Sequence, residues 1–316
     1  CNLAIEDADA LFGRPMGIPK TGVFGLYDLI GIDLMADVVV SLGNILPADD
    51  AFHAVGAANP AIAAMIAAGF TGDKGKGGFY CLDGTKRMAR QFAGYEGNDM
   101  PPLKPAKTKL PAAAIAAAEA AARQDEPLFM LLDGHDDQAK FCRRVLGRIL
   151  HYAASLVPSV TTTPQDIDDA MKLGFNWQRG PFEMIDAIGQ QRFAALLDEC
   201  GLTMPAFLEG GAPNYSVQAG SLMVRHADGA RQPVNLPEGV MRFHMTRRTL
   251  HPILTNDAAS LFALDGDLRL VEFHSKANAL TDASMEIVAA AANDHGAGII
   301  IHNDAQHFSA GVDLNA

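Results

Sequence analysis

Glycine and lysine alternate in one stretch of the sequence, Gly69 to Tyr80, in a pattern that could bind a phosphate. Lys74 and Lys76 stand among five glycines there. A glycine-rich loop with a lysine cradles a phosphate when a strand leads into it and a helix follows. No predicted strand precedes this stretch and no helix obviously follows it, so neither a Walker loop nor a dinucleotide fingerprint fits. The favoured interpretation is a solvated loop whose Phe79 and Tyr80 fill the core.

The other residue types used in catalysis lack the spacing of a site. His135 and His151 have no cysteine or carboxylate at ligand spacing, so we expect them to be structural or exposed and predict no metal site. A basic cluster from Arg242 to Arg248, with two histidines nearby, is interpreted as a joint between domains. The cysteines show no C-x-x-C spacing, which indicates neither a zinc knuckle nor a disulfide framework and favours a reducing cytosol: Cys1, Cys81, Cys142 and Cys200.

Composition limits the class of protein. With 316 residues, 49% hydrophobic and 20% charged, the chain is typical of a soluble globular protein of two or three domains. The net charge of −12 argues against nucleic acid as a partner, although one local basic patch could still hold a small anion. The longest apolar run, around residues 61–70, is shorter than the roughly 20 residues of a membrane span. We therefore expect a cytoplasmic protein, and the start at Cys1 and stop at Ala316 suggest a chain cut at both ends.

A helix, a crossing loop and a second helix occur twice along the chain. Four pairs of residues align at one constant offset: Gly22 with Gly180, Phe24 with Phe182, Asp28 with Asp186, and Gly31 with Gly189. An offset this long indicates duplicated domains rather than a solenoid. In the second copy we expect the first helix to end at Gly174 in a left-handed conformation and the next helix to start at Gly180-Pro181.

The remaining elements follow from periodicity and end signals. Apolar spacing and cap residues predict further helices over residues 32–42, 61–68, 112–123 and 136–156. Residues 81–110 predict an extended linker, and residues 213–255 a hairpin or pair of extended arms with a glycine turn. From Ala258 the pattern is β-β-α-β: strands 260–264 and 268–273, a helix capped by Asp282, and a strand 297–302.

Several of these segments resemble known families. Asp168 to Gly174, Arg179 to Asp186 and Gly75 to Tyr80 resemble the helical C-terminal domain of 3-hydroxyacyl-CoA dehydrogenases. Phe273 to Leu280, together with His307 to Leu314, resembles the opening of an enoyl-CoA hydratase (crotonase) domain. In this order the chain resembles the bacterial bifunctional fatty-acid β-oxidation fusion that places the dehydrogenase first.

The resemblance implies a mainly α fold with two repeated helical dehydrogenase C-terminal-like domains and a truncated α/β crotonase-like segment. The expected divisions are residues 1–88 for the first helical domain, 89–125 for a linker and Ala-rich helix, 126–212 for the second helical domain, 213–257 for an extended connector and 258–316 for the start of the crotonase-like domain. We expect the two helical domains to contact each other extensively, as a covalently linked pseudo-dimer.

The implied activity is NAD-dependent oxidation of a 3-hydroxyacyl-CoA to a 3-oxoacyl-CoA, with a His-Glu pair as base. In the family that pair and the glycine fingerprint for NAD lie upstream of the helical domain, and the chain has no G-x-G-x-x-G after a strand. We therefore expect this piece to be inactive, to bind no NAD, and to shape the substrate cleft and pack like a dimer. The implied partners are the acyl-CoA substrate and an upstream NAD-binding domain, with a possible homo-oligomer.

For the hydratase part, the resemblance implies a backbone N–H of Val312 that stabilises a thioester enolate. It also implies CoA contacts at Lys276, Ala277, Ala279, Ala310 and Gly311, although the matching loop in the family is commonly one residue longer. The second N–H and two catalytic glutamates would lie beyond Ala316. A tight turn after a strand would explain Ala310-Gly311 equally simply.

Two other functions remain open. The chain could be a self-contained helical binding or assembly module without catalysis, or its parent could have a degenerate hydratase half and an active dehydrogenase.

Overall fold

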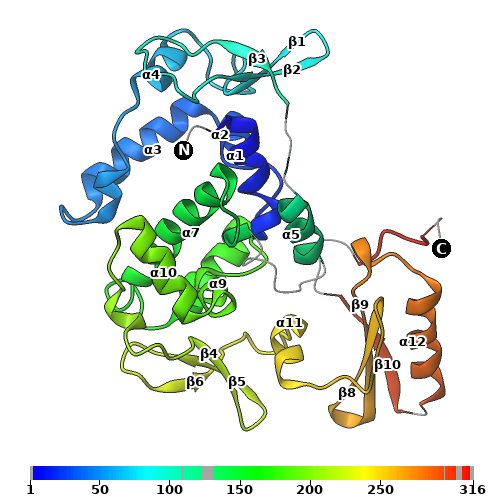
Figure 1. Cartoon of the computed structure of the whole chain (residues 1–316). Helices are drawn as coiled ribbons and strands as arrows, with labels where there is room; N and C mark the ends of the chain where they lie inside the picture. Colours follow the sequence, from blue (N-terminus) through cyan, green and yellow to red (C-terminus); the bar gives the residue numbers. More distant parts are fainter. Residues whose placement is uncertain are drawn as a thin grey trace.

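The computed structural model describes residues 3–107, 110, 112–122, 131–294, 296–303 and 308–313. In Figure 1 the first unit lies at the top, the second unit lies below it, and the last sheet lies at the lower right, near the C-terminus. The helix α5 (Ala112–Ala122) lies between them and packs against the first unit and against the loop that follows β9.

The first unit consists of helices followed by a small antiparallel sheet. Its elements are α1 (Ile5–Leu11), the 3₁₀ turn η1 (Arg14–Met16), α2 (Phe24–Ile30), α3 (Ile32–Ile45), η2 (Ala51–Ala54), α4 (Pro60–Ala67), β1 (Tyr80–Asp83), β2 (Lys86–Arg90) and β3 (Leu103–Pro105). Asn59 caps α4 by accepting hydrogen bonds from the backbone amides of Ala61 and Ile62, and Pro60 occupies its first turn. A small apolar core centres on the buried ring of Phe79.

The second unit likewise places helices before a small antiparallel sheet, but it begins with a long helix that has no counterpart among the described residues of the first unit, and its core is larger. Its elements are α7 (Asp137–Ser155), α8 (Pro164–Asp169), the π-helical turn η3 (Ala170–Gly174), α9 (Pro181–Ile188), α10 (Gln190–Cys200), η4 (Ala206–Leu208), β4 (Tyr215–Gln218), β5 (Ser221–Arg225) and β6 (Arg231–Pro233). Asp136 caps α7, Thr163 caps α8, and Glu183 in the first turn of α9 accepts a hydrogen bond from the Gly180 amide. The long helix α7 covers α9 and α10, and its buried face places Leu146 and Leu150 in the core.

The two units contact each other directly. Leu11, Met16 and Ile18 of the first unit belong to the core cluster of the second. The Gln178 amide donates to the Gly17 carbonyl at 2.9 Å, and the rings of Phe12 and Trp177 meet edge to face at 6.4 Å. The expected contact between the units is therefore present in the structure.

The last unit is a four-stranded mixed sheet with one helix. The segment α11 (Phe243–Thr246) and η5 (Arg247–Thr249) leads to β7 (Leu254–Thr255), β8 (Ala259–Leu264), η6 (Asp265–Asp267), β9 (Leu268–Phe273), η7 (Lys276–Asn278), α12 (Asp282–Asn293) and β10 (Gly298–Ile301). The strand order is β10-β9-β8-β7, with β10 parallel to β9 and the other pairs antiparallel. The predicted β-β-α-β order is confirmed.

Several predicted elements differ from the structure. The described residues of the range 81–110 are not an extended linker, because they include most of β1 and all of β2 and β3, and residue 88 lies inside β2. Residues 213–257 form the predicted hairpin but are more than a connector, because Tyr215, Leu222 and Val224 lie in the second unit's core. The left-handed residue after α8 is Asn176 (φ 54°) rather than Gly174, because the π-helical turn carries the chain past the glycine. Thr281, not Asp282, caps α12. The predicted helix end at residue 123 and domain start at residue 126 lie outside the described residues.

Candidate functional site

The expected oxyanion and CoA residues lie in two segments that run side by side, residues 276–280 and 309–313. Leu280 forms a parallel bridge with Val312, in which the Leu280 amide donates to the Gly311 carbonyl at 2.8 Å and the Asp313 amide donates to the Leu280 carbonyl at 3.0 Å. Successive amides of an extended chain point to opposite sides. The amide of Val312 therefore points away from Leu280, and no described residue accepts a hydrogen bond from it.

Further hydrogen bonds join these two segments. The Ala310 amide donates to the Ala277 carbonyl at 3.1 Å, and the Ser309 hydroxyl donates to the Asn278 carbonyl at 2.7 Å. Ala277 (φ 55°) and Asn278 (φ 53°) both adopt the left-handed region, which L-residues with a side chain rarely occupy. The loop is thus held in one shape by its partner segment.

The six residues that the resemblance selects are therefore close together in the structure. Lys276, Ala277 and Ala279 belong to one segment, and the neighbouring segment contributes Ala310-Gly311 and Val312. Val312 is 69% exposed and Gly311 has φ 89° with open space where a Cβ would be. The Val312 amide is thus a backbone donor at the surface, beside the loop that contains Lys276. A donor in this position could form a hydrogen bond to an acyl oxygen.

A buried carboxylate that no sequence motif indicates, Asp168, organises the second unit. Its two oxygens accept hydrogen bonds from the Phe182 amide (2.8 Å), the Glu183 amide (3.2 Å) and the Tyr215 hydroxyl (2.8 Å). Asp168 is fully buried, and that burial, together with the nearby charge of Glu183, raises its pKa well above the usual value. The side chain caps α9 across the crossing loop and connects it to β4.

The first unit contains the same arrangement around Asp9. Its carboxylate accepts hydrogen bonds from the amides of Phe24 (2.8 Å) and Gly25 (2.9 Å) and from the Tyr80 hydroxyl (2.9 Å). Burial raises the pKa of Asp9 as well. Asp9 and Asp168 each stand shortly before a crossing loop, and that shared position was the signal that could have revealed them.

The aligned pair Asp28 and Asp186 makes a second set of matching bonds. Asp28 accepts from the amides of Phe79 (2.8 Å) and Tyr80 (2.7 Å), and Asp186 accepts from the amides of Asn214 (2.8 Å) and Tyr215 (2.7 Å). Burial raises the pKa of Asp28 to about 6 against the opposing effect of these donors. In both units these carboxylates fix the start of the small sheet to a helix.

The lysines of the Gly69–Tyr80 stretch bind protein groups in the structure. Lys74 pairs with Asp33 at 2.7 Å, and the Lys76 ammonium donates to the Ala68 carbonyl at 3.0 Å. Phe79 and Tyr80 are buried, so the interpretation of a loop that fills the core is confirmed.

The arginine cluster connects the second unit to the last sheet. Arg242 pairs with Asp169 of α8 at 2.7 Å, and Arg247 pairs with the buried Glu272 of β9 at 3.0 Å. Arg248 lies over the Tyr215 ring at 5.7 Å. These contacts confirm that the cluster is a joint.

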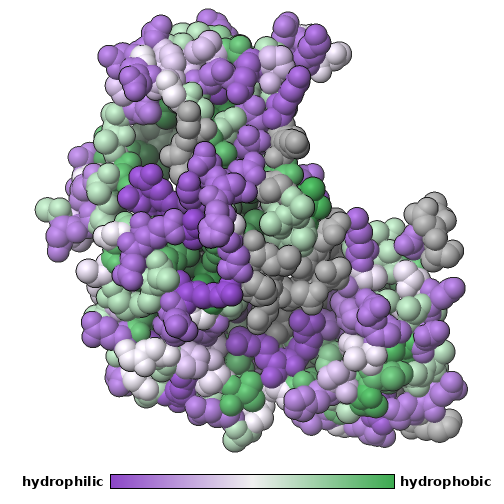
Figure 2. Space-filling model, in the orientation of Figure 1, coloured by the Kyte–Doolittle hydropathy of each residue, from purple (hydrophilic) through white to green (hydrophobic). Residues whose placement is uncertain are grey.

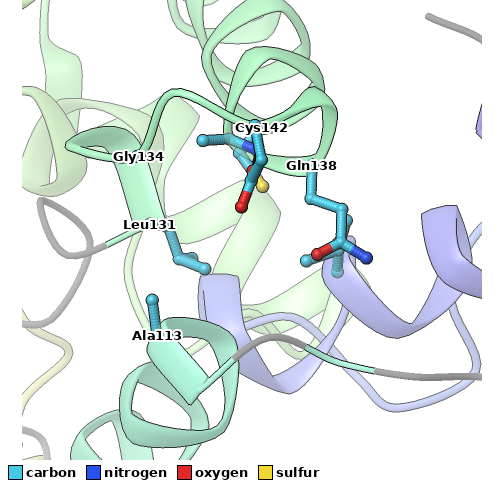
Figure 3. Close-up of a pocket in the computed structure, with 8 residues that line it drawn as sticks. Ala113, Leu131, Gly134, Gln138 and Cys142 are labelled. Atoms are coloured by element: carbon cyan, nitrogen blue, oxygen red, sulfur yellow. Dashed lines mark hydrogen bonds between the residues drawn. The ribbon is translucent and has the colours of Figure 1, made fainter.

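A small hollow lies between α5 and the start of α7 (Figure 3). Figure 3 shows Ala113, Leu131, Gly134, Gln138 and Cys142 around it. Its lining is mostly apolar, and burial raises the pKa of the Cys142 thiol to about 12, so this cysteine is not a reactive thiolate.

The described residues were compared with what a metal site, a nicotinamide dinucleotide site and a membrane-spanning helix require. No group of three or more His, Cys, Asp or Glu side chains among the described residues could hold a metal ion. The helix α12 connects the parallel strands β9 and β10, as in a dinucleotide-binding unit. The residues that follow β9, numbers 274–281, contain no glycine that would let the backbone approach a pyrophosphate, so this loop does not fit NAD. No helix in the described ranges is long and apolar enough to cross a membrane.

The chain is similar to a known protein family and to several named proteins. The model of the 3-hydroxyacyl-CoA dehydrogenase C-terminal domain matches residues 2–81 and 141–233. A Bacillus subtilis protein named as a 3-hydroxyacyl-CoA dehydrogenase is 27% identical over 98% of the chain, which covers 39% of that relative. A Rickettsia prowazekii protein named as a fatty acid oxidation complex trifunctional enzyme is 28% identical over 99% of the chain, which covers 40% of it. No solved structure matches the chain.

The chain thus spans about two fifths of the length of these curated relatives. The two ranges that match the family model contain more than half of the residues of this chain. This chain belongs to the 3-hydroxyacyl-CoA dehydrogenase C-terminal domain family.

Proposed function

We propose that the chain is the helical part of an NAD-dependent 3-hydroxyacyl-CoA dehydrogenase that acts in fatty-acid β-oxidation. The observation that carries the proposal is the family match to two separate ranges, residues 2–81 and 141–233. The names of the relatives, which align over nearly the whole chain, support the same reaction. The substrate class would be 3-hydroxyacyl-CoA thioesters.

The two helical units would be copies of one domain. Matching hydrogen bonds support this: Asp9 and Asp168 each cap the helix after a crossing loop and each accept from a tyrosine hydroxyl at the sheet. Joined through the shared core around Leu11, the copies would form a covalently linked pseudo-dimer. One unit would shape the substrate cleft and the other would pack against it.

The chain would supply cleft walls rather than the redox centre. Residues 274–281, which follow β9, contain no glycine to approach a pyrophosphate, and the sequence has no glycine fingerprint after a strand. The hydride acceptor and the His-Glu base would therefore come from an NAD-binding domain elsewhere in the parent protein. The piece by itself would not turn over substrate, and its location would be cytoplasmic.

The last unit would begin an enoyl-CoA hydratase domain. The strand order around β9 and the outward amide of Val312 support this assignment. The Val312 N–H would donate to the thioester oxygen as the enolate forms, where one such donor is worth about 3–4 kcal/mol. Lys276, Ala277 and Ala279, with Ala310-Gly311, would contact the CoA moiety.

The domain limits would be those of the sequence prediction, modified by the two sheets. The first helical domain would extend through β3 and the second through β6, followed by the arginine joint and the crotonase-like segment from Ala258. Oligomerisation of the parent would use surfaces outside the contact between the two units.

The test is an NAD-reduction assay with 3-hydroxybutyryl-CoA on the full-length parent and on this chain. We expect turnover by the parent and none by the chain. Activity in the isolated chain would contradict the assignment of the redox groups to another domain. An inactive parent that still assembles with other proteins would favour the alternative, a helical assembly module without catalysis.

A further inference from the structure

The direction of the Val312 N–H is set by the peptide group to which it belongs. The Gly311 carbonyl and the Val312 N–H are parts of one planar trans peptide group, so they point in opposite directions. The Leu280 amide donates to that carbonyl at 2.8 Å. In Figure 1 the two bonded segments lie together near the C-terminus, and in Figure 2 the last unit, at the lower right, shows hydrophilic and hydrophobic residues side by side. The aim of this donor therefore depends on how firmly residues 309–312 are held.

A glycine next to this peptide group would by itself leave the group free to rotate. Glycine has the widest range of backbone angles, and Gly311 has φ 89° with open space where a Cβ would be. The Gly311 amide, however, donates to the Ser309 hydroxyl at 3.0 Å. The peptide groups on both sides of Gly311 are thus held, one by the Ser309 side chain and the other by the Leu280 amide.

The same hydroxyl connects the glycine turn to the neighbouring loop. A serine hydroxyl can donate one hydrogen bond while it accepts another, and that of Ser309 donates to the Asn278 carbonyl at 2.7 Å. The Ala310 amide donates to the Ala277 carbonyl at 3.1 Å. Ala277 and Asn278 are the two left-handed residues of the loop, so both of their carbonyls are bound by residues 309–310. The Ser309 side chain therefore holds the turn and the strained loop in one arrangement.

A second side chain attaches this segment to the sheet. Asn303 follows β10, and its Oδ1 accepts a hydrogen bond at 2.7 Å from the amide of Phe273, the last residue of β9. Its Nδ2 donates to the Phe308 carbonyl. The rings of Phe273 and Phe308 also meet edge to face at 6.5 Å. The residue directly before Ser309 is thus connected to the end of β9 by the Asn303 carboxamide.

We propose that Ser309 and Asn303 are positioning residues for the Val312 N–H. The inference rests on the hydratase assignment proposed above. Ser309 fixes the direction of the donor through the Gly311 amide, and Asn303 fixes the place of the segment relative to the sheet. Both act through the backbone of residues 308–312 and not on the thioester itself. A donor that is already held in place needs no rearrangement when charge develops on the thioester oxygen.

The test is the hydration of crotonyl-CoA to 3-hydroxybutyryl-CoA by the full-length parent, followed by the loss of the enoyl absorbance. Ser309→Ala should lower kcat about 10- to 100-fold, less than removal of the donor itself, and should leave KM within about twofold. Ser309→Thr keeps a hydroxyl and should restore most of the rate. Asn303→Ala should lower kcat in the same way. Ser221→Ala, at an exposed serine of β5, is the control and should hydrate at the natural rate.

Circular dichroism checks that each variant is folded, which is expected because Ser309 and Asn303 are only partly buried. Equal kcat values for Ser309→Ala and the natural parent would overturn the positioning role and leave the hydratase assignment intact. A loss that Ser309→Thr does not restore would also overturn it, because the hydroxyl would then not be the group that acts. So would a higher KM at unchanged kcat, which indicates a contact with the substrate. A natural parent that does not hydrate crotonyl-CoA would instead overturn the hydratase assignment.

Discussion

Replacing Asp168 by alanine should destabilise the second unit strongly. The change leaves the Phe182 and Glu183 amides without their acceptor and leaves the Tyr215 hydroxyl buried without its own. Loss of a helix N-cap costs about 0.5–2 kcal/mol, and a buried unsatisfied hydroxyl costs about 1–3 kcal/mol. Removal of a desolvated carboxylate beside Glu183 offsets part of this. We therefore expect the free energy of unfolding to fall by about 2–4 kcal/mol.

The measurement is urea denaturation of the full chain followed by tryptophan fluorescence. Trp177 is the sole tryptophan and packs edge to face on Phe12, so its emission reports on the junction of the two units. Asp198→Ala, at an exposed aspartate of α10, is the control and should change the stability by less than about 0.5 kcal/mol. An Asp168→Ala variant as stable as this control would refute the capping role.

The dependence on pH gives a second check on Asp168. Its pKa is raised in the folded state, so the stability that its protonated form contributes is fully present below the ordinary carboxyl pKa. That contribution is lost as the pH rises through the folded pKa. Asp168→Asn cannot ionise, so the deficit of this variant relative to the natural chain should shrink with rising pH. A deficit that grows with pH would contradict the sign of the shift.

Three further perturbations test other parts of the structure. Asp28, whose pKa is raised from 3.8 to about 6, should contribute a stability that falls by about 3 kcal/mol as the pH rises from about 4 to 6 and beyond; Asp28→Asn should flatten that slope in urea titrations at pH 4 and 7. Gly147→Val should lower the free energy of unfolding by about 1–3 kcal/mol, because the added side chain overpacks the contact of α7 with α10. Gly43→Val, at a glycine whose added Cβ would have no atom within 4 Å, should lower it far less; equal losses would show that α7 is not closely packed. Val312→Pro removes an amide hydrogen and should lower hydratase turnover of the full-length parent about 100- to 1,000-fold, while Val312→Ala keeps the amide and should stay near the natural rate; equal rates would exclude the oxyanion role.

The helices could be predicted because their signals are local. Asn59-Pro60 and Thr163-Pro164 combine an N-cap with a proline in the first turn, and both helices begin there in the structure. The apolar spacing in residues 32–42 likewise marked α3, and the aligned glycines marked the crossing loops. The resemblance also selected the segments around Ala277 and Val312, which the structure brings together.

The small sheets could not be predicted in the same way. The central strand of the first sheet, Lys86-Arg87-Met88-Ala89-Arg90, is mostly polar and lacks the alternation that marks a strand, because Lys86 and Arg87 are exposed and only Ala89 and Arg90 are buried. The buried carboxylates of Asp9 and Asp168 also accept hydrogen bonds from tyrosines that lie far along the chain, and no local sequence pattern indicates that contact. Gly174 ends the π-helical turn as predicted but is not left-handed, because this turn shifts the left-handed position to Asn176.

The distance along the chain between each capping aspartate and its tyrosine also affects the order of folding. Asp9 and Tyr80 are 71 residues apart, and Asp168 and Tyr215 are 47 apart. During synthesis the first unit cannot close until its tyrosine has emerged, which is well after its helices are available. Closing the longer loop carries an extra entropic penalty of only about 0.4 kcal/mol. Contacts so distant in sequence slow folding, so each unit would remain an open helical segment until its small sheet arrives to close it.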